Sequence, residues 1–269
     1  MINCSRQLTT LSCLLAHGLL TLSLAATELE EGWQQLTRLN PAGARVKFVH
    51  AEGRAARFGE ALALSSLEPH TAEKLNSARA LLQNLATQNP GDDIGIAATY
   101  YLARIRQLHD APPDPVATAA AYRSLLAMHP GHPMAELAAP KLAILLLYAN
   151  VTPAEWEQSW EEIENLLPTL QTPAAQRDTR LVMAAAVLKL HHDHARAFPL
   201  LKFCDDASLV TRTTRRSQLL LQLAEAARGM GRQAEAAQYY ERYLAEFPRE
   251  AASEEIQRRL AALHQEVQP

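Results

Sequence analysis

One pattern recurs around a proline at three places in this chain, and it constrains the fold more than any other feature. Small residues, leucines and tyrosines occur at the same distances before each of the three prolines. Proline cannot continue a helix and restricts the residue before it, so each copy predicts a helix that ends in a turn. The three copies are Ala78-x3-Leu82-x2-Leu85 before Pro90, Tyr122-x2-Leu125-Leu126 before Pro130, and Ala236-x3-Tyr240-x2-Tyr243-Leu244 before Pro248.

Apolar residues also recur at fixed distances after each proline, which predicts a second helix. Leucine lies 12 residues after all three prolines, and isoleucine or leucine lies 15 residues after them. A single helix pair cannot bury its apolar face, so we expect the pairs to stack into an array. Only 10 of the 269 residues are glycine, and strong helix formers dominate the composition. We therefore predict an all-α fold with no substantial β-sheet.

Residues 217–250 carry the most complete copy of the pattern. They resemble one full tetratricopeptide repeat (TPR), although Ala224 and Ala227 replace the glycine and tyrosine usual in that family. The resemblance implies a right-handed α-solenoid of stacked antiparallel helix pairs. The tail that ends at Phe247-Pro248 is similar to that of bacterial cell-envelope TPR proteins. The residues at the positions that carry the family pattern are Leu220, Leu223, Ala224 and Ala227 in the first helix, Gly231 in the turn, and Ala236, Tyr240, Tyr243, Leu244 and Pro248 in the second helix and its end.

The same resemblance implies a groove that binds a protein or peptide, lined by the first helix of each pair. Placing the family's groove positions on this chain predicts a set of partner-binding residues. Tyr101 and Arg104 enter this set by register alone, and the alternative that Tyr101 belongs to the core and Arg104 is solvated stays open. The predicted partner-binding residues are Tyr101, Arg104, Gln218, Leu221, Glu225 and Arg228, with Gly229 beside them.

Composition shifts and turn residues predict three regions: a signal peptide over 1–26, an N-terminal helical cap over 27–71, and a TPR-like array over 72–269. Within the cap, residues 45–50 could be extended. Within the array, Pro140 lies inside an otherwise helical run and predicts a kink or a late helix start.

Other helix starts are marked by capping residues followed by proline. Asp114 is expected to cap a helix that has Pro115 at its first position. Thr152-Pro153-Ala154-Glu155 forms a capping box, and Thr172-Pro173 opens a further helix. Residues 152–204 are therefore predicted to be helical, although they do not match the repeat.

The N-terminus has the three parts of a signal peptide. Arg6 supplies the positive charge, an apolar run covers 8–24, and small residues allow cleavage after Ala25 or Ala26. The alternatives are an uncleaved anchor, which would need a cleaner apolar run, and lipidation of Cys13, which stands too early in that run. We expect export to the periplasm or cell envelope, without lipid attachment and without an integral membrane segment after cleavage.

Motifs of catalysis are absent from the sequence, and no cofactor is expected. There is no phosphate loop, dinucleotide fingerprint or serine nucleophile elbow, so an enzyme is not predicted. The nearly balanced charge, 26 Lys+Arg against 29 Asp+Glu, argues against binding of nucleic acid. A weak metal-site candidate is the cluster His191, His192 and His194, which the repeat register places in a turn. The arginines at 212, 215 and 216 are interpreted as a solvated helix start.

These observations lead to a scaffold or adaptor that binds a protein or peptide partner in its concave groove, within an envelope complex. Two alternatives stay open. One is a metal-binding envelope protein that uses the histidines of 191–194. The other is a structural module that assembles by end-to-end stacking.

Overall fold

A computed structural model describes residues 27–149 and 151–267, and these residues contain helices and turns but no β-strand. The chain divides into two compact units between Ala121 and Tyr122, a point that falls within helix α6 (Pro115–Met128). The predicted signal peptide lies outside the described residues. The boundary predicted at residue 71 is not tested by this division and stays a prediction.

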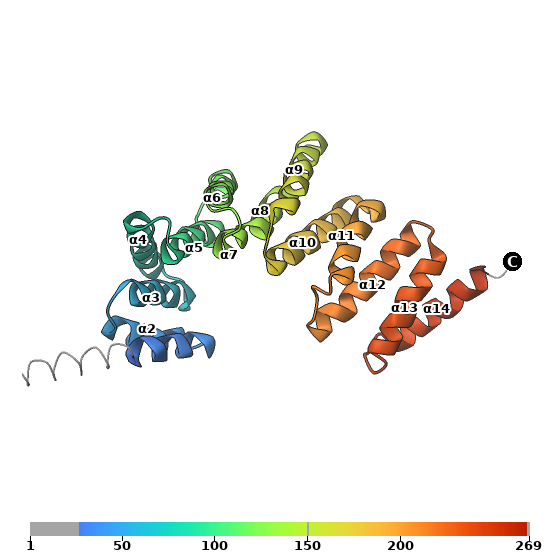
Figure 1. Ribbon diagram of the computed structural model, residues 1–269, viewed down its shortest axis with the longest axis horizontal. Helices are drawn as coiled ribbons and strands as arrows, with labels where there is room; N and C mark the ends of the chain where they lie inside the picture. Colours follow the sequence, from blue (N-terminus) through green and yellow to red (C-terminus); the bar gives the residue numbers. More distant parts are fainter. Residues whose placement is uncertain (1–26, 150, 268–269) are drawn as a thin grey trace, which may run out of the picture. The chain divides into compact units, whose positions relative to one another are not determined.

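The first unit is a row of consecutive helices, each packed against the next (Figure 1). Short connections force neighbouring helices to run antiparallel, as in stacked helix pairs. Residues 27–37 form the first described helix. It is followed by α2 (Pro41–His50), α3 (Arg54–Ser66), α4 (Ala72–Gln88) and α5 (Asp93–His109).

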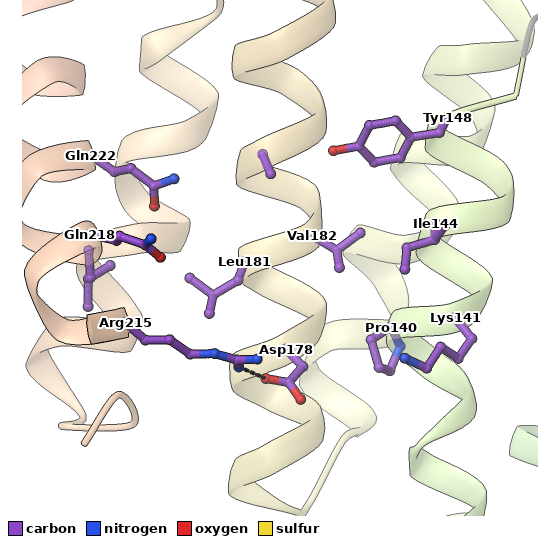
Figure 2. A pocket seen from close by; sticks show the side chains of 12 residues that line it. Pro140, Lys141, Ile144, Tyr148, Asp178, Leu181, Val182, Arg215, Gln218 and Gln222 are labelled. Carbon is purple, nitrogen blue, oxygen red and sulfur yellow. Dashed lines mark ion pairs between the residues drawn. The ribbon is translucent and has the colours of Figure 1, made fainter. Parts of the chain in front are cut away.

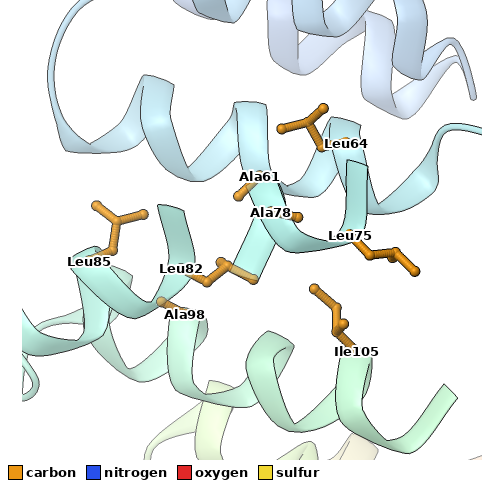
Figure 3. Close-up of a cluster of buried hydrophobic side chains, with 8 residues drawn as sticks. All are labelled: Ala61, Leu64, Leu75, Ala78, Leu82, Leu85, Ala98 and Ile105. Carbon is orange, nitrogen blue, oxygen red and sulfur yellow. The ribbon is translucent and has the colours of Figure 1, made fainter. Parts of the chain in front are cut away.

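The core of the first unit forms where α4 packs against both α3 and α5 (Figure 3). The residues of the first proline-linked pattern point into it, and Ala78, Leu82 and Leu85 are fully buried. Ile105, which lies 15 residues after Pro90, is buried in the same cluster. The spacing in the sequence thus corresponds to the buried face of each helix. The buried residues of this cluster are Ala61, Leu64, Leu75, Ala78, Leu82, Leu85, Ala98 and Ile105.

Phe48 organises the start of this unit and corrects one sequence interpretation. Residues 45–50 are not extended but belong to α2, because Asn40 accepts a hydrogen bond from Gly43 N and Pro41 occupies the first turn. Phe48 then packs edge-on against Trp33, with ring centroids 5.1 Å apart. A Cβ at Gly59 would lie 2.4 Å from the Phe48 ring, so α3 can approach this closely only with glycine there.

The second unit begins within α6 and, taken by itself, is also built from consecutive packed helices (Figure 1). In it α8 packs against α9 and α10, and each helix from α10 to α14 packs against the next one. Its remaining elements are α7 (Pro133–Glu136), α8 (Ala138–Leu147), α9 (Pro153–Leu166), the short 3-10 helix η1 (Leu167–Thr169), α10 (Pro173–His191), α11 (His194–Asp206), α12 (Thr213–Gly229), α13 (Gln233–Glu246) and α14 (Ser253–Val267).

The helix starts of this part of the chain follow the predicted capping residues. The capping box of Thr152 and Glu155 is complete, and Thr172 caps α10 through Ala175 N. Asp114 likewise accepts a hydrogen bond from Ala117 N at 2.8 Å at the start of α6. These three predictions are confirmed, and residues 152–204 are helical as expected.

Pro140 interrupts its helix as predicted, but the break lies upstream. Helix α7 ends at Glu136, and α8 begins at Ala138, after Leu137. Proline has no N–H to donate to the carbonyl four residues earlier, and its ring crowds that carbonyl. The residue affected is Glu136, which is where α7 stops.

The repeated pattern also forms the core of the second unit. Tyr122, Leu125, Tyr240 and Tyr243 are all buried, and Gly231 adopts the positive φ of 73° that the predicted turn requires. The all-α class and the stacked antiparallel helix pairs are therefore confirmed, and their arrangement is consistent with TPR-like repeats.

Candidate partner-binding groove

The first helices of three successive pairs in the second unit line one groove. Helices α8, α10 and α12 each present one face to it, and its volume is about 600 Å³ (Figure 2). The middle helix of the three, α10, contributes Leu181, Val182 and Ala185, which we call the floor of the groove (Figure 2). The residues lining the groove are Pro140, Lys141, Ile144, Tyr148, Asp178, Leu181, Val182, Ala185, Arg215, Gln218, Leu219 and Gln222.

Helical spacing brings these residues to one surface. On α10 the lining positions are 178, 181, 182 and 185, and on α12 they are 215, 218, 219 and 222. Both sets follow the i, i+3, i+4, i+7 spacing of a single helix face. Each α12 position lies 37 residues after its α10 counterpart, as from 178 to 215.

The 37-residue period extends to α8. Lys141 precedes Asp178 by 37 residues, and Tyr148 precedes Ala185 by the same interval. Equivalent positions of three pairs thus face the groove together, although their chemistry differs. A Lys, Asp, Arg series lies at one level and a Tyr, Ala, Gln series at another.

The α8 side of the groove leaves large apolar side chains uncovered. Ile144 is 37% exposed and Tyr148 is 40% exposed, and both point toward α10 (Figure 2). Burial raises the pKa of the Tyr148 hydroxyl, and the ammonium of Lys189 lies 5.9 Å from the centre of its ring. An exposed aromatic beside an apolar floor can bury a partner's side chain and still donate a hydrogen bond.

The α12 side is more polar. Gln218 and Gln222 point from α12 toward α10 in Figure 2 and offer amide donors and acceptors. Such groups can pair with the backbone of an extended peptide.

Next to the charged residues Asp178 and Arg215 of the groove lies a second cavity of about 360 Å³, which we call the arginine pocket. Its lining includes Arg177, Arg212 and Arg215 around the single carboxylate of Asp178. Arg177 Nε lies 2.7 Å from Asp178 Oδ1, and Arg215 Nη1 lies 3.8 Å from the same oxygen. Groove and pocket share Asp178 and Arg215 in their linings. The pocket is lined by Arg177, Asp178, Val210, Thr211, Arg212 and Arg215.

Among the residues predicted to bind a partner, the structure brings Gln218 to this groove. Leu221 is half-buried and is not among the lining residues. Glu225 and Arg228 lie further along α12 and bind one another, with Arg228 Nη2 2.9 Å from the Glu225 carboxylate. Glu225 also accepts hydrogen bonds from Tyr240 and Arg259.

The two predicted residues of the first unit lie on α5. Tyr101 is half-buried, and its ring packs against Phe58 with centroids 5.8 Å apart. Arg104 is half-buried and donates a hydrogen bond to Gln107. The binding role of all six predicted residues stays a prediction.

The histidines of 191–194 lie at the turn between α10 and α11. The His191 ring packs on Trp156 with centroids 4.0 Å apart, whereas His194 lies against Gly229. His192 has φ 52° at the helix end, and Asp193 caps α11. Within 27–149 and 151–267 no three His, Cys, Asp or Glu residues are placed to hold one metal ion.

Cys204 is fully buried on α11. Burial raises the pKa of its thiol to about 11, so the thiol is protonated at neutral pH. Across the described part of the chain, no helix combines the length and the apolar character needed to cross a bilayer.

Sequence reasoning missed most of the groove. The residues of α8 and α10 escaped because this part of the chain does not match the repeat, yet the 37-residue offset between their lining positions and those of α12 is visible in the sequence. Arg177 was missed for a different reason. It lines the same cavity as Arg212, which lies in the loop before α12, and nothing in the sequence links the two positions.

The described residues thus define a protein of stacked TPR-like helix pairs. No protein-family model matches the chain, and no curated protein matches it. Among solved structures, it is similar to a thermophilic TPR protein of Thermus thermophilus. The two are 18% identical with a TM-score of 0.44, over 79% of this chain and 100% of that one. A likeness at this level identifies neither an activity nor a partner.

Proposed function

We propose that this chain is an exported scaffold or adaptor that binds a peptide segment of a partner protein in the groove of α8, α10 and α12. The observation that carries the proposal is the uncovered apolar surface in a groove built from equivalent helix faces. Ile144 and Tyr148 are exposed beside the floor residue Leu181, with the amides of Gln218 and Gln222 opposite. Grooves that combine an apolar floor with a few polar groups are typical of peptide recognition.

The decisive variant fills the groove without touching the buried core. Ala185 lies half-buried on its floor, so Ala185→Trp places an indole where a peptide side chain would lie. Ala234→Trp is the matched control, because Ala234 is exposed on α13 and does not line the groove.

The assay starts from a phage-displayed library of random dodecapeptides, panned on the full chain. Enriched peptides are labelled and titrated by fluorescence anisotropy against the parent chain and both variants. We expect Ala185→Trp to weaken binding about tenfold or more and Ala234→Trp to leave it unchanged. The proposal fails if no peptide is enriched, or if the enriched peptides bind all three proteins equally.

Export is the second part of the proposal and is supported by the sequence of residues 1–26. Expression in a Gram-negative host with a C-terminal tag, followed by N-terminal sequencing, tests it. We expect a periplasmic product that begins at Ala26 or Thr27. A full-length product in the membrane fraction would indicate an anchor, and a full-length product in the cytoplasm would refute export.

A further inference from the structure

The arginine pocket carries more positive than negative charge. Arg177 and Arg215 both face the same oxygen of Asp178, and within 27–149 and 151–267 the side chain of Arg212 makes no ion pair. The lining of the pocket therefore holds three guanidinium groups but one carboxylate, and that carboxylate is paired with Arg177 and Arg215. Like charges gathered in a cavity repel one another, and an added anion relieves that repulsion.

The geometry of the pocket suits a carboxylate. Guanidinium groups present forked N–H donors that match the two oxygens of a carboxylate, and such charge-assisted hydrogen bonds are among the stronger ones in proteins. The pocket volume of about 360 Å³ leaves room for an anionic side chain beside Asp178.

The start of α12 adds to the positive potential of the pocket. Arg212 is the residue that precedes this 17-residue helix, and no side chain caps the first turn. Unpaired amide groups at a helix start attract anions. This contribution supports the arginines but would not define a site without them.

Because the arginine pocket adjoins the groove, the anion that it binds can belong to the peptide that occupies the groove. Asp178 and Arg215 belong to both linings, so a ligand in the pocket lies next to a ligand in the groove. Helix α8 packs against α10, and the Asp178–Arg215 ion pair links α10 to α12. Packed helices are separated by roughly 8–10 Å, so a groove across three helices spans at least about 20 Å, the length of about six extended residues. One short peptide segment can therefore reach both places.

We infer that the arginine pocket binds a carboxylate side chain of the segment whose apolar side chains occupy the groove. The partner is then a segment that carries an acidic residue next to apolar residues, with its glutamate or aspartate at the Arg177, Arg212 and Arg215 end. This inference rests on the proposed function, because it assigns the chemistry of the peptide that the groove binds.

The test uses two fluorescein-labelled peptides with amidated ends. The first carries two glutamates followed by alternating leucine and serine, and the second replaces the glutamates with glutamines. Fluorescence anisotropy with the full chain compares their affinities at low and high salt. We expect the glutamate peptide to bind about tenfold more tightly, with the difference shrinking as salt screens the charges.

Variants assign the preference to the pocket. The double variant Arg212→Gln with Arg215→Gln is expected to reduce the preference to less than about twofold, and Asp178→Asn to increase it. Arg249→Gln is the control, because Arg249 is exposed in the second unit and does not line the pocket. Circular dichroism melting curves verify that each variant is folded.

The outcomes separate this inference from the proposed function. Equal binding of both peptides, or a preference that survives in the double variant, overturns the inference. If Ala185→Trp weakens the binding of both peptides, while neither the glutamates nor the arginine substitutions change the affinity, the groove function stands and the arginine pocket has no part in recognition. If neither peptide binds while library-selected peptides do, the acidic segment is refuted and the groove is retained. Binding of inorganic phosphate that displaces neither peptide would show that the pocket takes a free anion instead, which also overturns the inference.

Discussion

Replacing Leu82 with alanine tests the claim that the first unit is held together by the residues of the repeated pattern. Leu82 is fully buried in the cluster where α4 packs between α3 and α5 (Figure 3). The substitution removes about three carbon groups at about 0.8 kcal/mol each, and an unfilled cavity adds to the loss, so we expect about 3 kcal/mol. That corresponds to an increase of about a hundredfold in the local opening equilibrium.

Hydrogen exchange followed by mass spectrometry measures this effect helix by helix. Helices in a stacked array contact mainly their neighbours, so faster exchange should concentrate in α3, α4 and α5. Helices α12 and α13 should keep their protection, because none of their residues belongs to this cluster. Gln83→Ala, at an exposed position of α4, is the control and should change exchange little.

Two results would refute the reasoning. A loss below about 1 kcal/mol in α3 to α5 would mean that Leu82 is not a central packing residue. An equal acceleration of exchange in α12 and α13 would mean that stability is not distributed as neighbour contacts along the stack.

Three further predictions concern the second unit. Cys204 should react with a thiol reagent only after unfolding. Because the pKa of its thiol is raised in the folded state, the stability that the buried thiol contributes should be lost as pH rises from about 9 toward about 11. Urea denaturation over this pH range measures the loss. Asp205→Asn should destabilise the fold by about 2–4 kcal/mol, because Arg216 and Arg242 lose their shared buried carboxylate. Burial alone would raise the pKa of Asp205, but hydrogen bonds from Arg242 and Arg216 hold it below its ordinary value, so this stability should be lost at acid pH, below about pH 4. Thr152→Ala should cost about 1 kcal/mol in thermal or urea unfolding through loss of the capping box, and an unchanged midpoint would contradict that role.

The pattern of the core could be predicted from the sequence because it depends on local spacing. Ala78, Leu82 and Leu85 are buried since their intervals fit one face of a helix and Pro90 follows at a fixed distance. Capping residues are equally local, which is why Thr152 and Thr172 mark helix starts correctly.

The extended reading of residues 45–50 is wrong because their valines and Phe48 resemble a strand when considered alone. The helix is set by Asn40 and Pro41 at its start and by the packing of Phe48 on Trp33. Tertiary contacts of this kind override local preference and are not visible in the sequence of the segment.

The groove depends on which helices become neighbours, and the sequence reveals that only in part. Gln218 can be identified through the family register, whereas Leu181 and Tyr148 require the stacking of α8, α10 and α12. The arginine pocket is harder still. Arg212 and Arg215 resemble a solvated helix start in the sequence, since nothing local indicates that Arg177 lies across the same cavity.

The charges of α12 suggest which part of that helix a peptide can use. The Glu225 carboxylate already accepts hydrogen bonds from Tyr240, Arg228 and Arg259. Burial would raise the pKa of Glu225, but these donors outweigh it and hold the pKa below its ordinary value. A peptide that bound Glu225 or Arg228 would have to replace contacts that already exist, which gains little net free energy. Arg212, just before α12, and Gln222, in its middle, line cavities instead. Recognition is therefore expected to involve the half of α12 that begins at the arginine pocket, where a new partner adds contacts instead of exchanging them.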